Sequence, residues 1–181
     1  MGHFVGTMPY LLGLALSLGV FALYVASRPS AFRISRSLTI DAPASTLFAL
    51  INDFHAWTAW SPWEKIDADL KRSYEGAASG VGAVYKWEGK KSGQGVMTLT
   101  DSVEASKIEI DLRFIKPIAA NNQTVFSLEP DGGGTKVTWT MTGNNNFVSK
   151  AFGVFMNMDT MIGRDFEKGL SAMRDAARAK A

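Results

Sequence analysis

The sequence predicts an α+β fold, in which a curved antiparallel sheet of about seven strands wraps around a long C-terminal helix, with a separate N-terminal transmembrane helix. Three observations predict this class. An uncharged apolar stretch begins the chain, alternating strand-like runs fill its middle, and an amphipathic helical pattern ends it. The length of 181 residues suits one domain with an appendage rather than two independent cores.

The first element is an apolar stretch from Phe4 to Ser27 that carries no formal charge. A helix of about 20 mainly apolar residues spans a bilayer, so this stretch is long enough. Tyr10 and Tyr24 lie toward its two ends, where amphipathic rings favour the membrane interface. We therefore expect residues 1–28 to form a membrane anchor and residues 29–181 to form a ligand-binding domain.

The charges that flank the apolar stretch predict its orientation. Arg28, Arg33 and Arg36 follow it, and cationic flanks tend to stay in the cytoplasm, so the domain is predicted on the cytoplasmic side. A cleavable signal peptide is an alternative, with a cleavage site at residues 25–27, although no Lys or Arg precedes the stretch. A buried core helix is a second alternative, although a helix that is apolar on every face does not suit a small domain.

The soluble part begins with a strand and a short helix. Residues 32–41 place apolar side chains at even positions, which predicts a half-buried strand. Asp41 or Ser45 can cap the helix that follows, and Pro43 suits its first turn. An aromatic-rich stretch over residues 54–64 comes next, and Pro62 within it favours a short helix followed by a loop.

Six further strands are predicted from runs that alternate or are rich in β-forming residues, with glycine-rich or polar turns between them. The alternation of apolar and charged residues over 107–115 is the clearest, and it indicates an antiparallel sheet with one buried and one wet face. The predicted strands are residues 69–75, 81–88, 94–103, 107–115, 122–130 and 134–142.

The chain ends in a pattern that predicts one long helix from Phe147 to Lys180. Its apolar residues recur every three or four positions, so one face is apolar. This helix is the only predicted element large enough to cover the inner face of the sheet. Because large side chains cannot meet everywhere along a curved sheet, we expect a cavity between sheet and helix. The apolar stripe comprises Phe152, Phe155, Ile162, Phe166, Leu170 and Met173.

Several local strings and the order of elements resemble the START-like (SRPBCC) superfamily, most closely its bacterial polyketide cyclase/dehydrase-like branch, over residues 33–178. The strings are IDAPASTLFALINDF from residue 40, WSPWEK at 60–65, GVGAVYKWEG at 80–89, VTWTMTGNNNF at 137–147 and MIGRDFEKGL at 161–170. The resemblance implies a helix-grip fold with a deep apolar pocket. It also implies binding of lipids, polyketides or similar hydrophobic molecules, but not one particular reaction.

The candidate ligand-binding residues are aromatic and methionine side chains expected near this cavity. Rigid aromatic walls suit a flat or long apolar ligand, and flexible thioethers adapt to irregular ones. Plain core packing is the alternative for each residue, and Met161 is expected to point away from the cavity. The candidates are Trp57, Trp60, Trp63, Tyr85, Trp87, Met97, Phe114, Phe126, Trp139, Met141, Phe152, Phe155 and Met156.

Two carboxylates complete the candidate ligand-binding set. Helical phase places Asp159 near the middle of the apolar stripe, where a carboxylate needs a partner or solvent. It is a candidate anchor for a ligand hydroxyl or carbonyl, unless a strand residue pairs with it or the helix breaks near Gly153 or Gly163. Glu64 is expected in a solvated loop or at the pocket mouth, and it could join Asp159 in acid–base work.

Composition narrows the classes of function. The chain has no cysteine and only two histidines, His3 and His55, so we predict no metal site, no cofactor and no assigned catalytic residue. The net charge of +2 without a long basic run argues against a nucleic-acid partner. The leading hypothesis is a membrane-tethered binding module for a hydrophobic small molecule or lipid. A cyclase/dehydratase-like enzyme and a protein-interaction module with an undefined protein partner are the alternatives.

Overall fold

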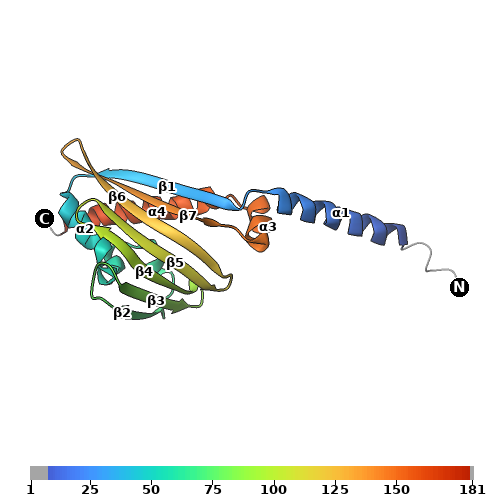
Figure 1. Ribbon diagram of the computed structural model, residues 1–181, viewed down its shortest axis with the longest axis horizontal. Helices are drawn as coiled ribbons and strands as arrows, with labels where there is room; N and C mark the ends of the chain where they lie inside the picture. The colour runs from blue at the N-terminus through green and yellow to red at the C-terminus, as the bar shows by residue number, and fades with distance from the viewer. Residues whose placement is uncertain (1–7, 180–181) are drawn as a thin grey trace. The chain divides into compact units, whose positions relative to one another are not determined.

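The computed structural model describes residues 8–179 and confirms the predicted α+β class (Figure 1). Within that range the strands form one antiparallel seven-stranded sheet in the order β1-β7-β6-β5-β4-β3-β2. Every predicted strand end lies within two residues of the observed one. The strands are β1 (Ala31–Ile40), β2 (Lys71–Gly76), β3 (Ala83–Gly89), β4 (Gly93–Val103), β5 (Lys107–Lys116), β6 (Ala120–Asp131) and β7 (Gly134–Asn144).

The described residues divide into two compact units. One unit contains residues 8–30 and 145–157, and the other contains residues 31–144 and 158–179. The smaller unit holds α1 and α3, and the larger unit holds the sheet and the remaining helices. The helices are α1 (Met8–Ser27), α2 (Ala44–Asn52), η1 (Phe54–Ala59), η2 (Pro62–Lys65), α3 (Phe147–Phe155) and α4 (Met158–Arg178).

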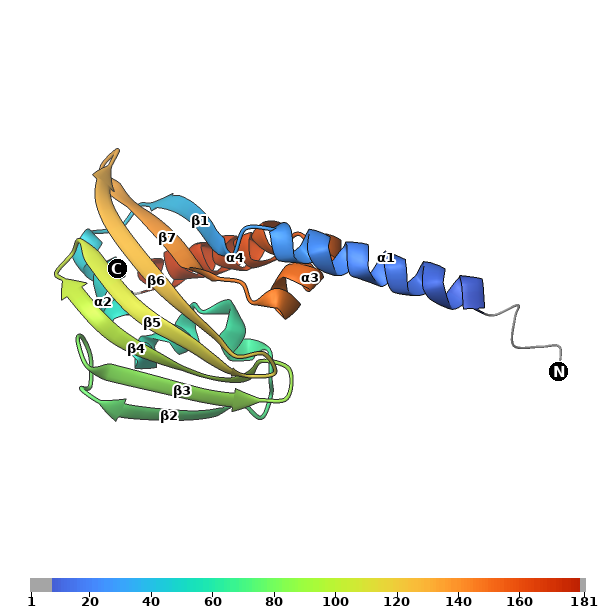
Figure 2. The same cartoon turned by 45° about the vertical axis from the view of Figure 1, so that its right-hand side comes forward.

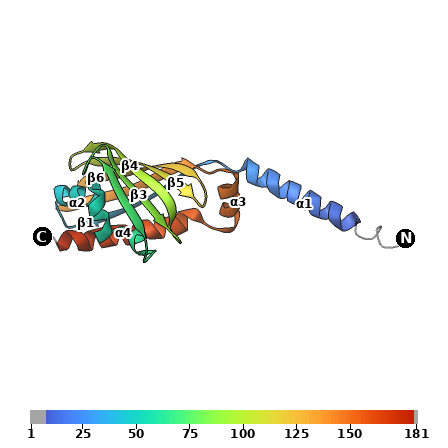
Figure 3. The same ribbon diagram turned by 90° about the horizontal axis from the view of Figure 1, so that it is seen from below.

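In the larger unit the sheet twists and curves around α4 (Figures 2 and 3). Strand residues alternate between the face toward α4, here called the inner face, and the opposite outer face. α4 packs on β1, α2 and η2. Helix glycines permit this close approach, because a Cβ on Gly169 would press on the ring of Trp139. The buried residues of α4 are Gly163, Phe166, Gly169, Leu170, Met173 and Ala177.

The prediction of one continuous helix from Phe147 to Lys180 is wrong. α3 ends at Phe155, Met156 adopts an extended backbone with φ −127° and ψ 130°, and α4 begins at Met158. The side chain of Asn146 accepts a hydrogen bond from the Ser149 N–H and so caps the start of α3. Apolar periodicity did not reveal the break because apolar residues continue on both sides of it.

The aromatic-rich stretch forms the short 3₁₀ helices η1 and η2, with Pro62 at the start of η2. Two indole N–H groups attach this stretch to the last turn of α2. Trp57 Nε1 donates to the carbonyl of Ile51 at 2.9 Å, and Trp60 Nε1 donates to that of Leu50 at 2.8 Å. These hydrogen bonds satisfy the polar part of both rings, so the rings can be buried under the inner face of the sheet.

Candidate functional site

A cluster of aromatic rings fills the core where sheet, η1, η2 and α4 meet. Ring centroids within the cluster lie between 4.2 and 6.4 Å apart, and Trp139 stacks on Phe166 at 4.2 Å with an interplanar angle of 4°. At these contact distances the rings pack against one another as in an ordinary protein core. The cluster comprises Trp57, Trp60, Trp63, Phe126, Trp139 and Phe166, of which all but Phe166 are predicted site residues.

Two predicted site residues, Trp87 and Phe114, lie at the opposite end of the inner face from α2, beside Phe32 and Leu112, which were not predicted. The C-terminal end of α2 lies beside the end of β4, because Ser102 Oγ on β4 donates to Asn52 Oδ1 on α2 at 2.7 Å. At the other end, apolar side chains remain half-buried rather than covered. We call this set the open-end patch. It comprises Phe32, Trp87, Leu112 and Phe114.

Two glycines shape the open-end patch. A Cβ on Gly95 would collide with the ring of Trp87, and a Cβ on Gly143 would collide with the ring of Phe32. Both rings therefore lie close over neighbouring strands. Trp87 also meets Phe114 edge-on, with ring centroids 5.8 Å apart. The patch residues lie on β1, β3 and β5, which other strands separate, and the rings of Phe32 and Trp87 reach over the glycines of β7 and β4. The buried side chains of Tyr85, Met97 and Met141 border the patch.

A buried polar atom lies within this apolar surface. Asn122 pairs with Gly143 on one side and with Leu112 on the other, so its side chain shares their inner face. Its Oδ1 is buried and has no hydrogen-bond partner among the described residues, while its Nδ2 lies 3.9 Å from Met141 Sδ. A buried acceptor without a partner is uncommon in proteins, and a ligand hydroxyl or N–H could satisfy it. Sequence analysis missed Asn122, although strand alternation places it on the inner face.

Glu64 is buried, contrary to the expectation of a solvated loop, and its side chain is 6% exposed. Its Oε2 accepts a hydrogen bond from Arg72 Nε at 2.6 Å, and its Oε1 accepts a short one from the Tyr85 hydroxyl. Arg72 Nη2 also donates to the Glu64 backbone carbonyl at 2.8 Å. The Glu64 carboxylate therefore joins η2 to β2 through Arg72 and to β3 through Tyr85. Sequence analysis missed Arg72.

The electrostatics of this cluster favour a fixed ion pair with a neutral phenol. Burial, and to a lesser extent the hydrogen bond to Glu64, raises the pKa of Tyr85 far above its usual value. The hydrogen bond to Glu64 raises the pKa of Arg72. Tyr85 therefore stays protonated at physiological pH and can donate a hydrogen bond, but it is a poor base.

Asp159 faces the sheet as helical phase predicts, but it is not buried within the stripe. Its side chain is 58% exposed in the first turn of α4, and its Oδ2 lies 3.0 Å from Arg36 Nη2. Arg36 also pairs with Glu167 at 3.0 Å. The hydrogen bond from Arg36 lowers the pKa of Asp159. A strand partner, which the sequence left open, thus satisfies this carboxylate.

The proposed acid–base pair of Glu64 and Asp159 receives no support from the arrangement of their partners. Glu64 bonds to residues of β2 and β3, whereas Asp159 bonds to Arg36 on β1, at the other edge of the sheet. Each carboxylate has its own arginine partner. In a pair built for proton transfer, both groups would face one reacting bond.

Three predicted lining residues, Phe152, Phe155 and Met156, lie in the smaller unit rather than in the core of the larger one. Their side chains are exposed, with Phe155 at 78%. Met161, expected to point away from the cavity, is also exposed. The break between α3 and α4 separates these residues from the stripe to which the sequence assigned them.

A hollow of about 910 Å³ lies mainly on the outer face of the sheet, although Phe32 and Leu112 of the open-end patch also border it, as does Asn122. Thr98, Asp111, Arg113 and Gln123 contribute to it, and each alternates with an inner-face residue. None of the predicted site residues lines it. The lining is Ala31, Phe32, Val96, Thr98, Asp111, Leu112, Arg113, Asn121, Asn122, Gln123, Thr142, Gly143 and Asn144.

Comparison with known proteins agrees with the fold. A family model described as polyketide cyclase / dehydrase and lipid transport matches residues 31–178. The comparison with curated proteins found no match.

Among solved structures, protein CV1439 from Chromobacterium violaceum is 15% identical, with a TM-score of 0.58 over 83% of this chain and 98% of that one. A Thermobifida fusca protein is 22% identical, with a TM-score of 0.58 over 80% and 92% of the two chains. The Aha1 dimer from Colwellia psychrerythraea is 14% identical, with a TM-score of 0.57 over 81% and 96%. At these identities the structures show a shared fold alone.

Proposed function

Because the chain belongs to the polyketide cyclase / dehydrase and lipid transport family, we propose that it binds a hydrophobic small molecule or a lipid against the inner face of its sheet. The observation that carries the proposal is the half-buried open-end patch around the unpartnered Oδ1 of Asn122. An apolar surface with one convergent polar atom is typical of ligand sites. The patch supplies the affinity, and Asn122 would orient a donor group on the ligand.

The polar groups near the patch support binding over catalysis. Both carboxylate oxygens of Glu64 already accept hydrogen bonds, and the Tyr85 phenol is held neutral. A general base needs a free acceptor and a pKa near the working pH. A cyclase/dehydratase-like enzyme is therefore the less favoured alternative.

We also propose that α1 tethers the domain to a membrane. Among the described residues, α1 is long and apolar enough to cross a bilayer, with 20 residues and a mean hydropathy of 1.9. A signal sequence has the same properties, so protein sequencing of the mature N-terminus would distinguish the two. Tethering would keep the domain at the membrane, into which hydrophobic ligands partition.

Native mass spectrometry of residues 29–181 tests the binding proposal. We expect co-purifying hydrophobic molecules, and we expect Phe114→Gln to weaken rebinding of an extracted ligand by about tenfold or more, since burying an aromatic side chain contributes about 1.5–3 kcal/mol. Arg113→Gln is the matched control, because Arg113 lies on the same strand but on the outer face. A domain that is empty and binds no tested lipid would refute the proposal.

The outer hollow favours a second candidate function, a protein-interaction module. Its volume of about 910 Å³ and its mixed lining, which includes Asp111, Arg113 and Gln123, suit a protein partner that presents both apolar and hydrogen-bonding groups. The same two variants separate the candidates. A partner captured from solubilised membranes and lost in Arg113→Gln, but retained in Phe114→Gln, would support this function.

A further inference from the structure

α3 exposes apolar side chains and partly buries polar ones, which is the reverse of the pattern expected for a helix in water. Ser149 and Lys150 are half-buried, whereas the large apolar side chains of α3 other than the half-buried Val154, and the adjacent Met156, are exposed by 44–78%. None of the nine residues of α3, all of which the structure describes, is buried. A helix that meets water normally turns its apolar face inward. The exposed apolar residues are Phe147, Val148, Phe152, Phe155 and the adjacent Met156.

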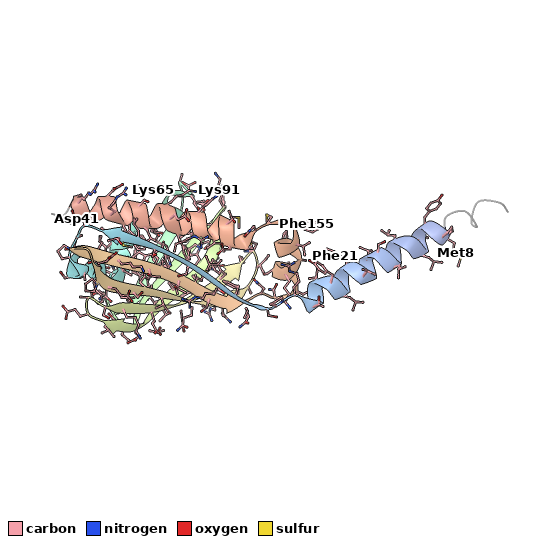
Figure 4. All side chains as sticks on the ribbon, turned by 90° about the horizontal axis from the view of Figure 1, so that it is seen from above. Met8, Phe21, Asp41, Lys65, Lys91 and Phe155 are labelled. Carbon is pink, nitrogen blue, oxygen red and sulfur yellow. The ribbon has the colours of Figure 1, made fainter. Side chains whose placement is uncertain are left out.

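The smaller unit attaches α3 to the C-terminal part of α1. The ring centroids of Phe155 and Phe21 lie 6.0 Å apart (Figure 4). Lys150 Nζ donates to the carbonyl of Ala26 at 3.5 Å, and the Asn145 N–H donates to that of Ser30 at 2.8 Å. The position of α3 along the axis of α1 is therefore defined.

If α1 spans a bilayer as proposed above, that position corresponds to the edge of the bilayer. Arg28 Nη1 donates to the Tyr24 hydroxyl at 2.9 Å, and such tyrosine and arginine residues mark a membrane interface. Phe21 precedes Ser27 by six residues, which is about 9 Å along a helix. Phe155 lies beside Phe21 and so reaches a similar depth. Interfacial helices bury their apolar faces by about 5–10 Å.

We propose that α3 is a second membrane-contacting element, which lies in the interface beside α1 with its apolar face in lipid. The inference rests on the tethering role proposed above for α1. Lipid is the occupant because the apolar face of α3 continues the lipid-facing surface of α1 at the Phe21–Phe155 contact. Lys150 and Arg28 lie near the same end of α1, where they suit anionic headgroups.

The absence of cysteine from the chain permits a direct test with single-cysteine variants of the full chain. Phe155→Cys and Phe152→Cys probe α3, and Leu16→Cys probes the middle of α1. Lys136→Cys, at an exposed position on the outer face of the sheet, is the water-accessible control. Each variant carries an environment-sensitive fluorophore and is placed in vesicles of phosphatidylcholine and phosphatidylglycerol. Quenching by brominated lipid is compared with quenching by aqueous iodide.

We expect brominated lipid to quench the labels at positions 155, 152 and 16, and iodide to quench the label at position 136. If the label at position 16 is reached by iodide, the tethering proposal fails. If position 16 is in lipid while positions 155 and 152 are reached by iodide, only the proposal for α3 is overturned. Far-UV circular dichroism of each variant verifies that the helices remain formed.

Discussion

The Glu64–Arg72–Tyr85 cluster shows how one buried carboxylate organises its surroundings. Glu64 accepts from two side chains that belong to different strands. Removing one donor would leave a buried oxygen without its partner, which costs more than an exposed hydrogen bond contributes. The cluster therefore acts as a structural connection between η2 and the edge of the sheet.

Tyr85→Phe is expected to lower the free energy of unfolding by about 1–3 kcal/mol, because the Glu64 oxygen loses its donor while the ring is retained. Urea unfolding of residues 29–181 measures the change. Tyr74→Phe, which removes a half-buried phenol hydroxyl from the same face, is the control and should have a smaller effect. Equal losses in both variants would contradict the role assigned to the Tyr85–Glu64 bond.

Because Asp159 pairs with Arg36, we expect the stability of the fold to depend on pH. The pKa of Asp159 is lowered in the folded state by the hydrogen bond from Arg36, which also pairs with Glu167. A lowered folded pKa stabilises the fold above the unfolded value of about 3.9, and that stabilisation is lost as pH falls through the folded pKa. We expect Asp159→Asn to unfold at a lower urea concentration at neutral pH, with the difference from wild type vanishing in acid.

Urea midpoints across acidic and neutral pH provide this measurement. Asp111→Asn is the control, because Asp111 lies on the outer face, away from Arg36. A midpoint difference for Asp159→Asn that is the same at every pH would show that the Arg36 pair contributes nothing through its charge.

At the scale of elements, the break between α3 and α4 assigns similar apolar residues to different surroundings. Phe166 is buried against Trp139, whereas Phe152 is half exposed on α3. A continuous helix would have placed both on one stripe against the sheet. The two-residue break at Met156 and Asn157 thus decides which phenylalanines belong to the core.

Phe166→Ala is expected to cost about 3–5 kcal/mol of stability, because it leaves a cavity beside Trp139. Phe152→Ala should cost far less, since its side chain is exposed. Thermal unfolding of the full chain in detergent micelles compares the two variants. Comparable losses would mean that α3 packs like α4 and that the break does not separate their roles.

At the scale of the whole molecule, if α1 spans a membrane as proposed, its orientation decides in which compartment the domain lies. Arg28 and Arg33 follow the apolar helix, and cationic flanks favour the cytoplasmic side. We expect a reporter fused to the C-terminus to be active only in the cytoplasm. Reversal by Arg28→Glu with Arg33→Glu would tie the orientation to these charges, and periplasmic or extracellular activity of the unmutated fusion would contradict it.

The sequence alone was sufficient for the fold class, the seven strands, the apolar N-terminal helix and the family. Alternation with a period of two and an apolar helical stripe are properties of a local segment of sequence. They can therefore be recognised without knowing which other segments pack against it. The even-numbered positions of residues 32–40 also indicated the partner of Asp159. Arg36 interrupts an otherwise apolar series there, and it lies on the inner face beside Asp159.

Only the tertiary structure decided which candidate side chains pack against each other and which remain uncovered. Trp57, Trp60 and Trp139 became core, Glu64 became buried by two strand partners, and Phe155 stayed outside on α3. These outcomes depend on contacts between segments far apart in the chain and on a break whose flanks are equally apolar. Periodicity defines the face on which a residue lies, but it contains no information about what covers that face.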